Sequence, residues 1–292
     1  MDGFETANVT VGDGTIRIHR HGEGPPVLLL HGFPQNSMLW ARVAPRLAER
    51  FHVVCADLPG YGGSSPPAGV EGASKRAMAA RLVEAMATLG HERFAVVGHD
   101  RGGRVAYRMA FDHPDRVARL AVLDILPTWT YWARMDRAFA LDVYHWGFLA
   151  QPHPMPERLI GGAPDYWIDH TLASWTAAKS LDAFAPDALE SYRAQARDPD
   201  QLKAMCDDYR AGATLDVDHD AADREAGRRI ACPTLALWGG GGIAGKAATP
   251  LETWREWAED VRGEGVEGSG HFIPEEAPEA CAEALLRFLA DG

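Results

Sequence analysis

A short turn near residue 100 carries the residues with the clearest chemistry. Residues 98–102 read Gly-His-Asp-Arg-Gly, between an apolar stretch that predicts a buried strand and a predicted helix. This is the nucleophile-elbow pattern, in which two glycines permit a strained turn that exposes the side chain between them. The central residue is Asp100, where serine is usual. A plain turn with an aspartate helix cap is the alternative, and we predict that Asp100 is a nucleophile.

An aspartate nucleophile restricts the reaction. A serine that attacked a saturated carbon would leave an ether, which water does not readily cleave. A carboxylate that attacks the same carbon leaves an ester, which activated water can hydrolyse, so one difficult step becomes two easier ones. Asp100 therefore indicates displacement at an sp³ carbon, with a halide or an epoxide oxygen as the leaving group. Ordinary esters and amides are disfavoured as substrates.

Two further residues complete a predicted catalytic triad. His271 lies in the glycine-flanked loop 268–272, near the C-terminus. Hydrolases with a nucleophile elbow have their catalytic histidine in this part of the chain, after the nucleophile and the acid. Asp124 ends the apolar stretch that follows the elbow, so its carboxylate can orient His271. The loop after the next strand, residues 239–242, is all glycine and offers no competing acid. For His271, the alternative is a surface loop histidine.

The segment 31–35, His-Gly-Phe-Pro-Gln, follows another apolar strand. In this arrangement such a segment supplies one backbone N–H of an oxyanion hole, and the residue after the nucleophile supplies the other. We expect these donors to be the backbones of Phe33 and Arg101. Structural packing of the turn is a second role that the same segment can have.

Arg101 and Arg104 are three residues apart at the start of the predicted helix, so their side chains share a face. Cations are disfavoured at a helix N-terminus, and local conflicts of this kind concentrate at functional sites. We predict that this pair clamps a substrate carboxylate. A pair of structural salt bridges is the alternative. Arg108, one turn further, is expected to be an ordinary surface or packing residue.

The elements around these residues predict the fold. Apolar strands at 26–30, 52–56, 93–97 and 118–123 alternate with helices, including one from Asn36 or Ser37 to Arg50, and an antiparallel hairpin precedes them. This alternation predicts an α/β fold with a mostly parallel, doubly wound sheet. From Pro127 to about Ala222 no buried strand is found, and the sequence is helical and aromatic. We predict a core domain of residues 1–126 and 223–292 and a helical cap of residues 127–222 that acts as a lid.

Composition excludes several classes of function. The net charge of −12 gives no electrostatic footprint for nucleic acid. The four cysteines form no CxxC pair, so no metal site is expected, and we expect free thiols in a reducing, cytoplasmic setting. The sequence has no signal-peptide pattern and no apolar run of membrane-spanning length. We therefore expect neither a membrane nor a nucleic-acid partner.

With these motifs in place, the sequence resembles the fluoroacetate dehalogenases, a branch of the α/β-hydrolase superfamily that includes haloalkane dehalogenases and epoxide hydrolases. The likeness extends over nearly the whole chain. Its most specific segments, besides the elbow and the loop of His271, are residues 144–146, 151–161 and 206–212.

The resemblance implies a role for each matching residue. Asp100 would be the nucleophile, His271 the base and Asp124 its partner, with Arg101 and Arg104 on the carboxylate. His145, Trp146 and Tyr209 would donate hydrogen bonds to the departing halide, and Trp175 would line the pocket. The resemblance also implies a homodimer and the hydrolysis of a short 2-haloacid, with water as co-substrate and no cofactor.

Three other interpretations stay open at this point. An epoxide hydrolase would protonate its substrate with cap tyrosines, for which Tyr131, Tyr144 and Tyr209 are candidates. A haloalkane dehalogenase usually has tryptophan after the nucleophile, where this chain has Arg101. Both act on neutral substrates, which give the arginines nothing to bind. A non-catalytic anion receptor would not require Asp100, Asp124 and His271 together.

Overall fold

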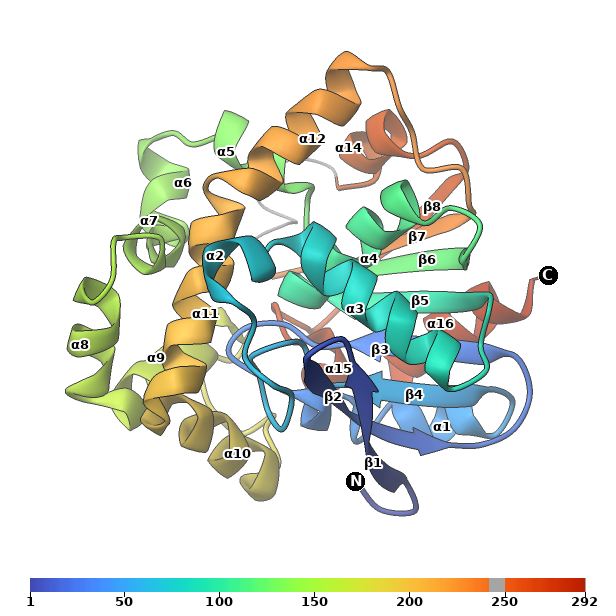
Figure 1. Cartoon of the computed structure of the whole chain (residues 1–292), viewed down its shortest axis with the longest axis horizontal. Coiled ribbons are helices and arrows are strands. Elements are labelled where there is room, and N and C mark those ends of the chain that lie inside the picture. Colours follow the sequence, from blue (N-terminus) through green and yellow to red (C-terminus); the bar gives the residue numbers. More distant parts are fainter. Residues whose placement is uncertain (242–249, 292) are drawn as a thin grey trace.

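The computed structural model describes residues 1–241 and 250–291. Within them, one sheet has the strand order β1-β2-β4-β3-β5-β6-β7-β8 (Figure 1). The β1–β2 and β2–β4 pairs are antiparallel and the other pairs are parallel. The strands are β1 Glu5–Val11, β2 Gly14–His21, β3 Pro26–Leu30, β4 His52–Ala56, β5 Phe94–His99, β6 Val117–Leu123, β7 Thr234–Gly239 and β8 Val261–Val266.

The central strands are buried on both faces, which explains their continuous apolar sequences. In β5, for example, Val96 packs in one hydrophobic core and Val97 in the other, because successive side chains point to opposite faces. The predicted doubly wound α/β fold is confirmed. The described helices that precede β6 or follow β7 are η1 Ser37–Trp40, α1 Ala44–Ala48, α2 Gly69–Gly72, α3 Lys75–Thr88, α4 Asp100–Asp112, α14 Pro250–Trp257, α15 Ile273–Glu276 and α16 Pro278–Ala290.

One local prediction is wrong. The helix expected from Asn36 or Ser37 to Arg50 is two separate elements, η1 and α1. Pro45 lies in the first turn of α1. Proline has no amide N–H and its ring clashes with the carbonyl four residues earlier, so a continuous helix cannot pass through this position.

The segment between β6 and β7 consists of helices and connecting loops. They are α5 Thr128–Ala133, α6 Arg137–Asp142, α7 Tyr144–Leu149, α8 Met155–Gly161, α9 Pro164–Trp175, α10 Pro186–Arg197, α11 Pro199–Gly212 and α12 Leu215–Glu225. Figure 1 shows the green and yellow helices α5 to α9 gathered at one end of the sheet. Tyr209 on α11 contacts Phe33, which follows β3, so this helical segment meets the sheet at the carboxyl end of β3. Residues 127–222 are called the cap below, after the lid predicted for them.

None of the described helices combines the length and the apolar character needed to cross a membrane.

Candidate active site

Asp100 occupies a strained turn between β5 and α4. Its φ of 45° lies in the left-handed region, which is costly for a residue with a side chain. Glycines on both sides make the turn possible: a Cβ at Gly98 would lie 2.4 Å from the carbonyl oxygen of Gly102, and one at Gly102 would lie 2.2 Å from that of His31. The elbow therefore has the geometry that its sequence predicted.

The two carboxylate oxygens of Asp100 have different surroundings. Oδ1 accepts a hydrogen bond of 2.8 Å from the backbone N–H of Phe33. Oδ2 lies 3.8 Å from Nε2 of His271. The backbone N–H expected as the second donor belongs to Arg101, in the first turn of α4. This arrangement holds one oxygen and leaves the other to react.

His271 is oriented by Asp124, as expected for a triad. Its Nδ1 lies 2.7 Å from Oδ2 of Asp124, whose Oδ1 accepts a 3.1 Å hydrogen bond from the backbone N–H of Gly239. An Nδ1–H that donates to Asp124 leaves Nε2 as the basic nitrogen. Nε2 is buried and has no hydrogen-bond partner. Gly242, the last residue of the glycine-rich turn, lies outside the described residues.

The surrounding charges adjust both groups for their roles. Burial alone would lower the pKa of His271, but its hydrogen bond to Asp124 and the nearby carboxylates raise it above its ordinary value. Burial alone would raise the pKa of Asp100, yet the positive charges around it, His271 first, hold that pKa below its ordinary value. Asp100 is thus ionised at neutral pH, as a nucleophile must be.

The two predicted clamp arginines are fully buried, and each is partly engaged. Arg101 donates through Nε and Nη2 to Asp208, with 2.5 Å between Nη2 and Oδ1, whereas its Nη1 has no partner. Arg104 donates through Nη1 to the carbonyl of Leu126 at 2.9 Å, whereas its Nε has no partner. Buried polar groups are normally hydrogen-bonded. Arg101 thus forms a structural salt bridge and keeps Nη1 without a partner among the described residues, while its role in binding a ligand stays a prediction.

Arg108, by contrast, is a packing residue and not a surface one. It is buried, and its guanidinium pairs with Asp112 at 2.8 Å and Asp223 at 2.5 Å.

Asp208 is a buried partner of Arg101 that was not predicted from the sequence. This fully buried carboxylate on α11 accepts hydrogen bonds from Arg101, from Nζ of Lys75 and, at 2.8 Å, from the hydroxyl of Tyr61. Burial opposes its ionisation, but Arg101 and Lys75 hold its pKa far below its ordinary value. A carboxylate next to Tyr209 on a cap helix was the available signal, but only the fold brings it to Arg101.

Aromatic rings of the cap cover the arginines. The Cζ of Arg101 lies 4.2 Å from the ring centre of Tyr209, and that of Arg104 lies 4.4 Å from Trp146 and 4.6 Å from Tyr131. These distances are those of cation–π contacts. Tyr209 and Trp146 are thus beside the elbow, although they are far from it in the sequence.

His145, the remaining expected halide donor, lies with its ring centre 5.7 Å from that of Tyr209. Both Nδ1 of His145 and the hydroxyl of Tyr209 are buried without a partner. Burial lowers the pKa of His145 to about 3 and raises that of Tyr209 well above its ordinary value, so both groups are neutral near pH 7. The ring of Trp175 lies between those of His145 and His271, with 4.4 Å and 5.4 Å between the respective ring centres.

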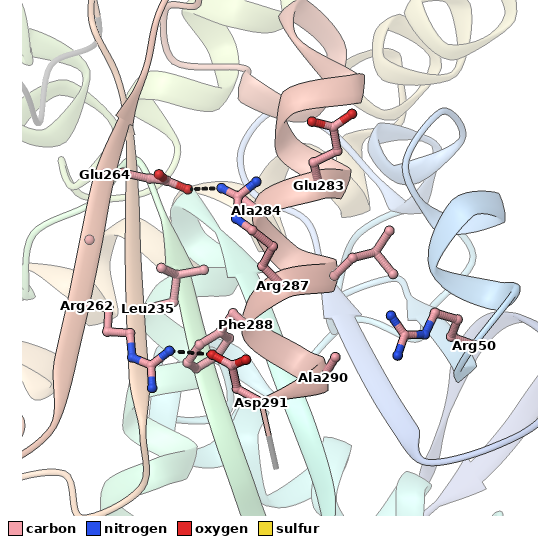
Figure 2. Close-up of a pocket in the computed structure, with 12 residues that line it drawn as sticks. Arg50, Leu235, Arg262, Glu264, Glu283, Ala284, Arg287, Phe288, Ala290 and Asp291 are labelled. Carbon is pink, nitrogen blue, oxygen red and sulfur yellow. Dashed lines mark hydrogen bonds and ion pairs between the residues drawn. The ribbon is translucent and has the colours of Figure 1, made fainter.

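A separate surface pocket, of about 630 Å³, lies between β8 and α16 (Figure 2). Its charged side chains largely pair with one another: Arg287 with Glu264 at 2.6 Å, and Arg262 with Asp291. None of the predicted site residues lines it. We therefore place the candidate active site at Asp100.

Comparison with known proteins agrees with this geometry. Residues 25–278 match the family model described as the alpha/beta hydrolase fold. The chain belongs to the α/β-hydrolase family. This α/β hydrolase is 47% identical to a fluoroacetate dehalogenase from Burkholderia sp, over 100% of this chain and 95% of that protein. It is 33% identical to a soluble epoxide hydrolase from Corynebacterium sp. (strain C12), over 92% of this chain and 91% of that one.

A solved structure of an α/β hydrolase from Nostoc sp PCC 7120 superimposes with a TM-score of 0.96 at 46% identity, covering 99% of both chains. The similarity therefore includes the cap as well as the sheet.

Proposed function

We propose that this α/β hydrolase cleaves the carbon–halogen bond of short 2-haloacids, haloacetate and in particular fluoroacetate, to give the 2-hydroxyacid and halide. One observation carries the proposal: next to the proposed nucleophile Asp100, two buried guanidinium nitrogens, Nη1 of Arg101 and Nε of Arg104, have no hydrogen-bond partner among residues 1–241 and 250–291. A substrate carboxylate would satisfy both. The similarity to a fluoroacetate dehalogenase supports the same substrate class.

In the first step, the arginine nitrogens hold the carboxylate and present C2 of the substrate to Asp100. Oδ2 attacks C2, the C2–halogen bond breaks, and the halide leaves with the bonding electrons. The product is an ester between Asp100 and the acid. Oδ1 stays on the backbone N–H of Phe33, which fixes the carboxylate for attack.

In the second step, Nε2 of His271 takes a proton from water while the water oxygen bonds to Cγ of Asp100. The negative charge develops on Oδ1, which already faces the N–H of Phe33, with the N–H of Arg101 as the proposed second donor. The Cγ–Oδ2 bond then breaks, and the departing hydroxyacid oxygen takes the proton from His271. The second proton of the water is lost to solvent, which restores the carboxylate of Asp100. Asp124 stabilises the imidazolium in the interval.

For the halide, we propose His145, Trp146 and Tyr209 as donors and Trp175 as part of the pocket wall. The unpartnered Nδ1 of His145 and hydroxyl of Tyr209 support this assignment. Fluoride needs dense solvation, and fixed donors in a closed site supply it without reorganisation. We also propose that residues 127–222 form a lid that keeps bulk water from these groups.

Epoxide hydrolysis is the second candidate, because the chain is also similar to a soluble epoxide hydrolase. It would require tyrosine hydroxyls in the pocket. Tyr209 meets this condition, and Tyr131 is also buried, with its ring centre 4.6 Å from Cζ of Arg104, but Tyr144 is 44% exposed. A neutral epoxide would also leave Arg101 and Arg104 with unsatisfied nitrogens, so the arginines favour the haloacid.

Ion-selective detection of fluoride and chloride, with a panel of haloacetates and a terminal epoxide, tests the proposal. We expect many halide ions released per protein molecule and no turnover of the epoxide. Binding without turnover would indicate an anion receptor, and turnover of the epoxide alone would indicate the second candidate. Release of chloride but no fluoride would retain the dehalogenase and exclude fluoroacetate.

We further propose that the protein is a homodimer in a reducing, cytoplasmic setting. The dimer is supported by large apolar side chains that are exposed on helices α6 to α9, namely Leu141, Tyr144, Met155, Leu159 and Tyr166. The reducing setting is supported by the four cysteines, which are unpaired. Light scattering after gel filtration should give twice the chain mass of 31.8 kDa. A single-chain mass would contradict the dimer.

A further inference from the structure

Glu276, the last residue of α15, lies five residues after the base His271, and its carboxylate binds the loop that carries the base. Oε2 accepts hydrogen bonds from the backbone N–H groups of Gly270, at 2.9 Å, and Ala177, at 2.7 Å. Oε1 accepts from the N–H of Phe272 at 2.9 Å. One side chain therefore holds the residues on both sides of His271 and ties them to the cap.

Backbone contacts reinforce this junction. The N–H of His271 donates to the carbonyl of Trp175 at 3.0 Å. The approach is so close that a Cβ at Gly270 would lie 2.5 Å from both the carbonyl oxygen of Trp175 and the backbone nitrogen of Ala177. The loop of the base and cap residues 175–177 are thus packed as one unit.

The loop needs such external restraint. Gly268 and Gly270 have no side chains that restrict their backbone, and Gly268 adopts a φ of 75°. Hydrogen bonds from N–H groups to a carboxylate are about twice as strong as those between neutral groups. Without Glu276, the N–H groups of Gly270 and Phe272 would lose their acceptor. His271 would then be held by Asp124 at its ring, by the carbonyl of Trp175 at its backbone N–H, and by Nε2 of His99, which lies 2.8 Å from its carbonyl oxygen.

We propose that Glu276 is a positioning residue for His271 that acts on the hydrolysis of the ester and not on its formation. The inference rests on the function proposed above. Alkylation uses Oδ2 of Asp100, the arginines and the halide donors, none of which Glu276 contacts. Hydrolysis alone requires Nε2 of His271 to lie within reach of a water beside Asp100.

The neighbouring residue provides a matched control. Glu275 is fully buried and accepts a 3.0 Å hydrogen bond from the hydroxyl of Tyr192 and another from the side chain of Gln35. Burial raises the pKa of Glu275 well above its ordinary value, and glutamine keeps the length and shape of the side chain. Among the described residues, its side chain accepts hydrogen bonds from Gln35 and Tyr192, whereas the amides of Gly270 and Phe272 donate to Glu276.

The test is rapid-quench, single-turnover kinetics with chloroacetate on Glu276→Gln, Glu276→Ala and the control Glu275→Gln. Mass spectrometry of the peptide that contains Asp100 gives the rates of ester formation and ester decay separately. We expect unchanged formation and slower decay in both Glu276 variants, by about 100-fold in Glu276→Ala, since a displacement of about 1 Å can cost this much. Glu275→Gln should retain both rates.

Equal losses in formation and decay, or unchanged decay in the folded Glu276→Gln protein, would overturn the inference. Glu276→Gln is the smaller change and keeps the test decisive where Glu276→Ala does not fold. His271→Asn is included to separate the two claims. If His271→Asn accumulates the ester and the Glu276 variants do not, only the positioning role fails; if no protein forms the ester, the proposed function fails.

Discussion

Arg101 donates to Asp208 through Nε and Nη2, which leaves Nη1 as its nitrogen without a partner. Arg101 belongs to the core helix α4 and Asp208 to the cap helix α11. The carboxylate of Asp208 on α11 therefore fixes the orientation of the Arg101 guanidinium. If Arg101 binds the substrate carboxylate as proposed, that subsite requires α11 in this position.

Replacing Arg101 or Arg104 by lysine should therefore impair binding of the haloacid although the charge is kept. Lysine has no planar fork, so it cannot satisfy its fixed partners and a substrate carboxylate together. We expect a lower kcat/KM for chloroacetate. The decrease should correspond to a loss of transition-state stabilisation on the order of 2–4 kcal/mol. Arg108→Lys is the control, because Arg108 is also buried on α4 but pairs with Asp112 and Asp223.

Chloroacetamide is the complementary test of the clamp, since it lacks the charge. The parent enzyme should hydrolyse it poorly. Comparable turnover of chloroacetate and chloroacetamide would remove the support for a carboxylate subsite and favour a neutral substrate.

The pH dependence should distinguish the two chemical steps. His271 must be neutral to take a proton from water, and its pKa is raised above the ordinary 6.5. Ester hydrolysis should therefore slow as the pH falls through this raised pKa. Asp100 has a lowered pKa, so alkylation should continue over the same range. Quenched samples at decreasing pH should contain more ester, and an ester level independent of pH would argue against His271 as the base.

Tyr209→Phe should discriminate between fluoride and chloride. It removes one unpartnered hydroxyl with little change of shape. The bond to fluoride is stronger and the anion smaller, so its departure depends more on donors that strengthen as charge develops. We expect fluoroacetate turnover to fall by roughly 100-fold or more, the scale of losing one oxyanion-type donor, and chloroacetate turnover to fall much less. Tyr144→Phe, at a partly exposed position, is the control; equal losses for both substrates would indicate that Tyr209 only shapes the pocket.

The sequence allowed the sheet and the elbow to be predicted because both depend on local patterns. The apolar run of β5, followed by two glycines around Asp100, determines a strand, a strained turn and a helix with little help from distant residues. The predicted helix from Asn36 or Ser37 to Arg50 was wrong because Pro45 interrupts it, and α1 starts as a separate element at Ala44. Predictions of this kind rest on the period of apolar residues along the sequence and on the residue types that form turns.

The partners of the arginines could not be predicted in this way. Asp208 follows Arg101 by 107 residues, and only the docking of α11 brings the two together. The roles of His145, Trp146 and Tyr209 were also beyond local patterns, because their neighbours depend on how the cap packs. The family resemblance predicts these roles, and they stay predictions. The contacts of Tyr209 with Arg101 and of Trp146 with Arg104 show only that these two rings lie beside the arginines.

The covalent ester on Asp100 is the central claim, and one measurement tests it most directly. His271→Asn should still be alkylated by chloroacetate but should not hydrolyse the ester, because the basic Nε2 is lost while Asp100 and the arginines remain. Mass spectrometry should find the added carboxymethyl group on the peptide that contains Asp100, and Asp100→Ala should show neither this adduct nor turnover. An unmodified Asp100 peptide in a His271→Asn protein that has consumed chloroacetate would contradict the two-step mechanism.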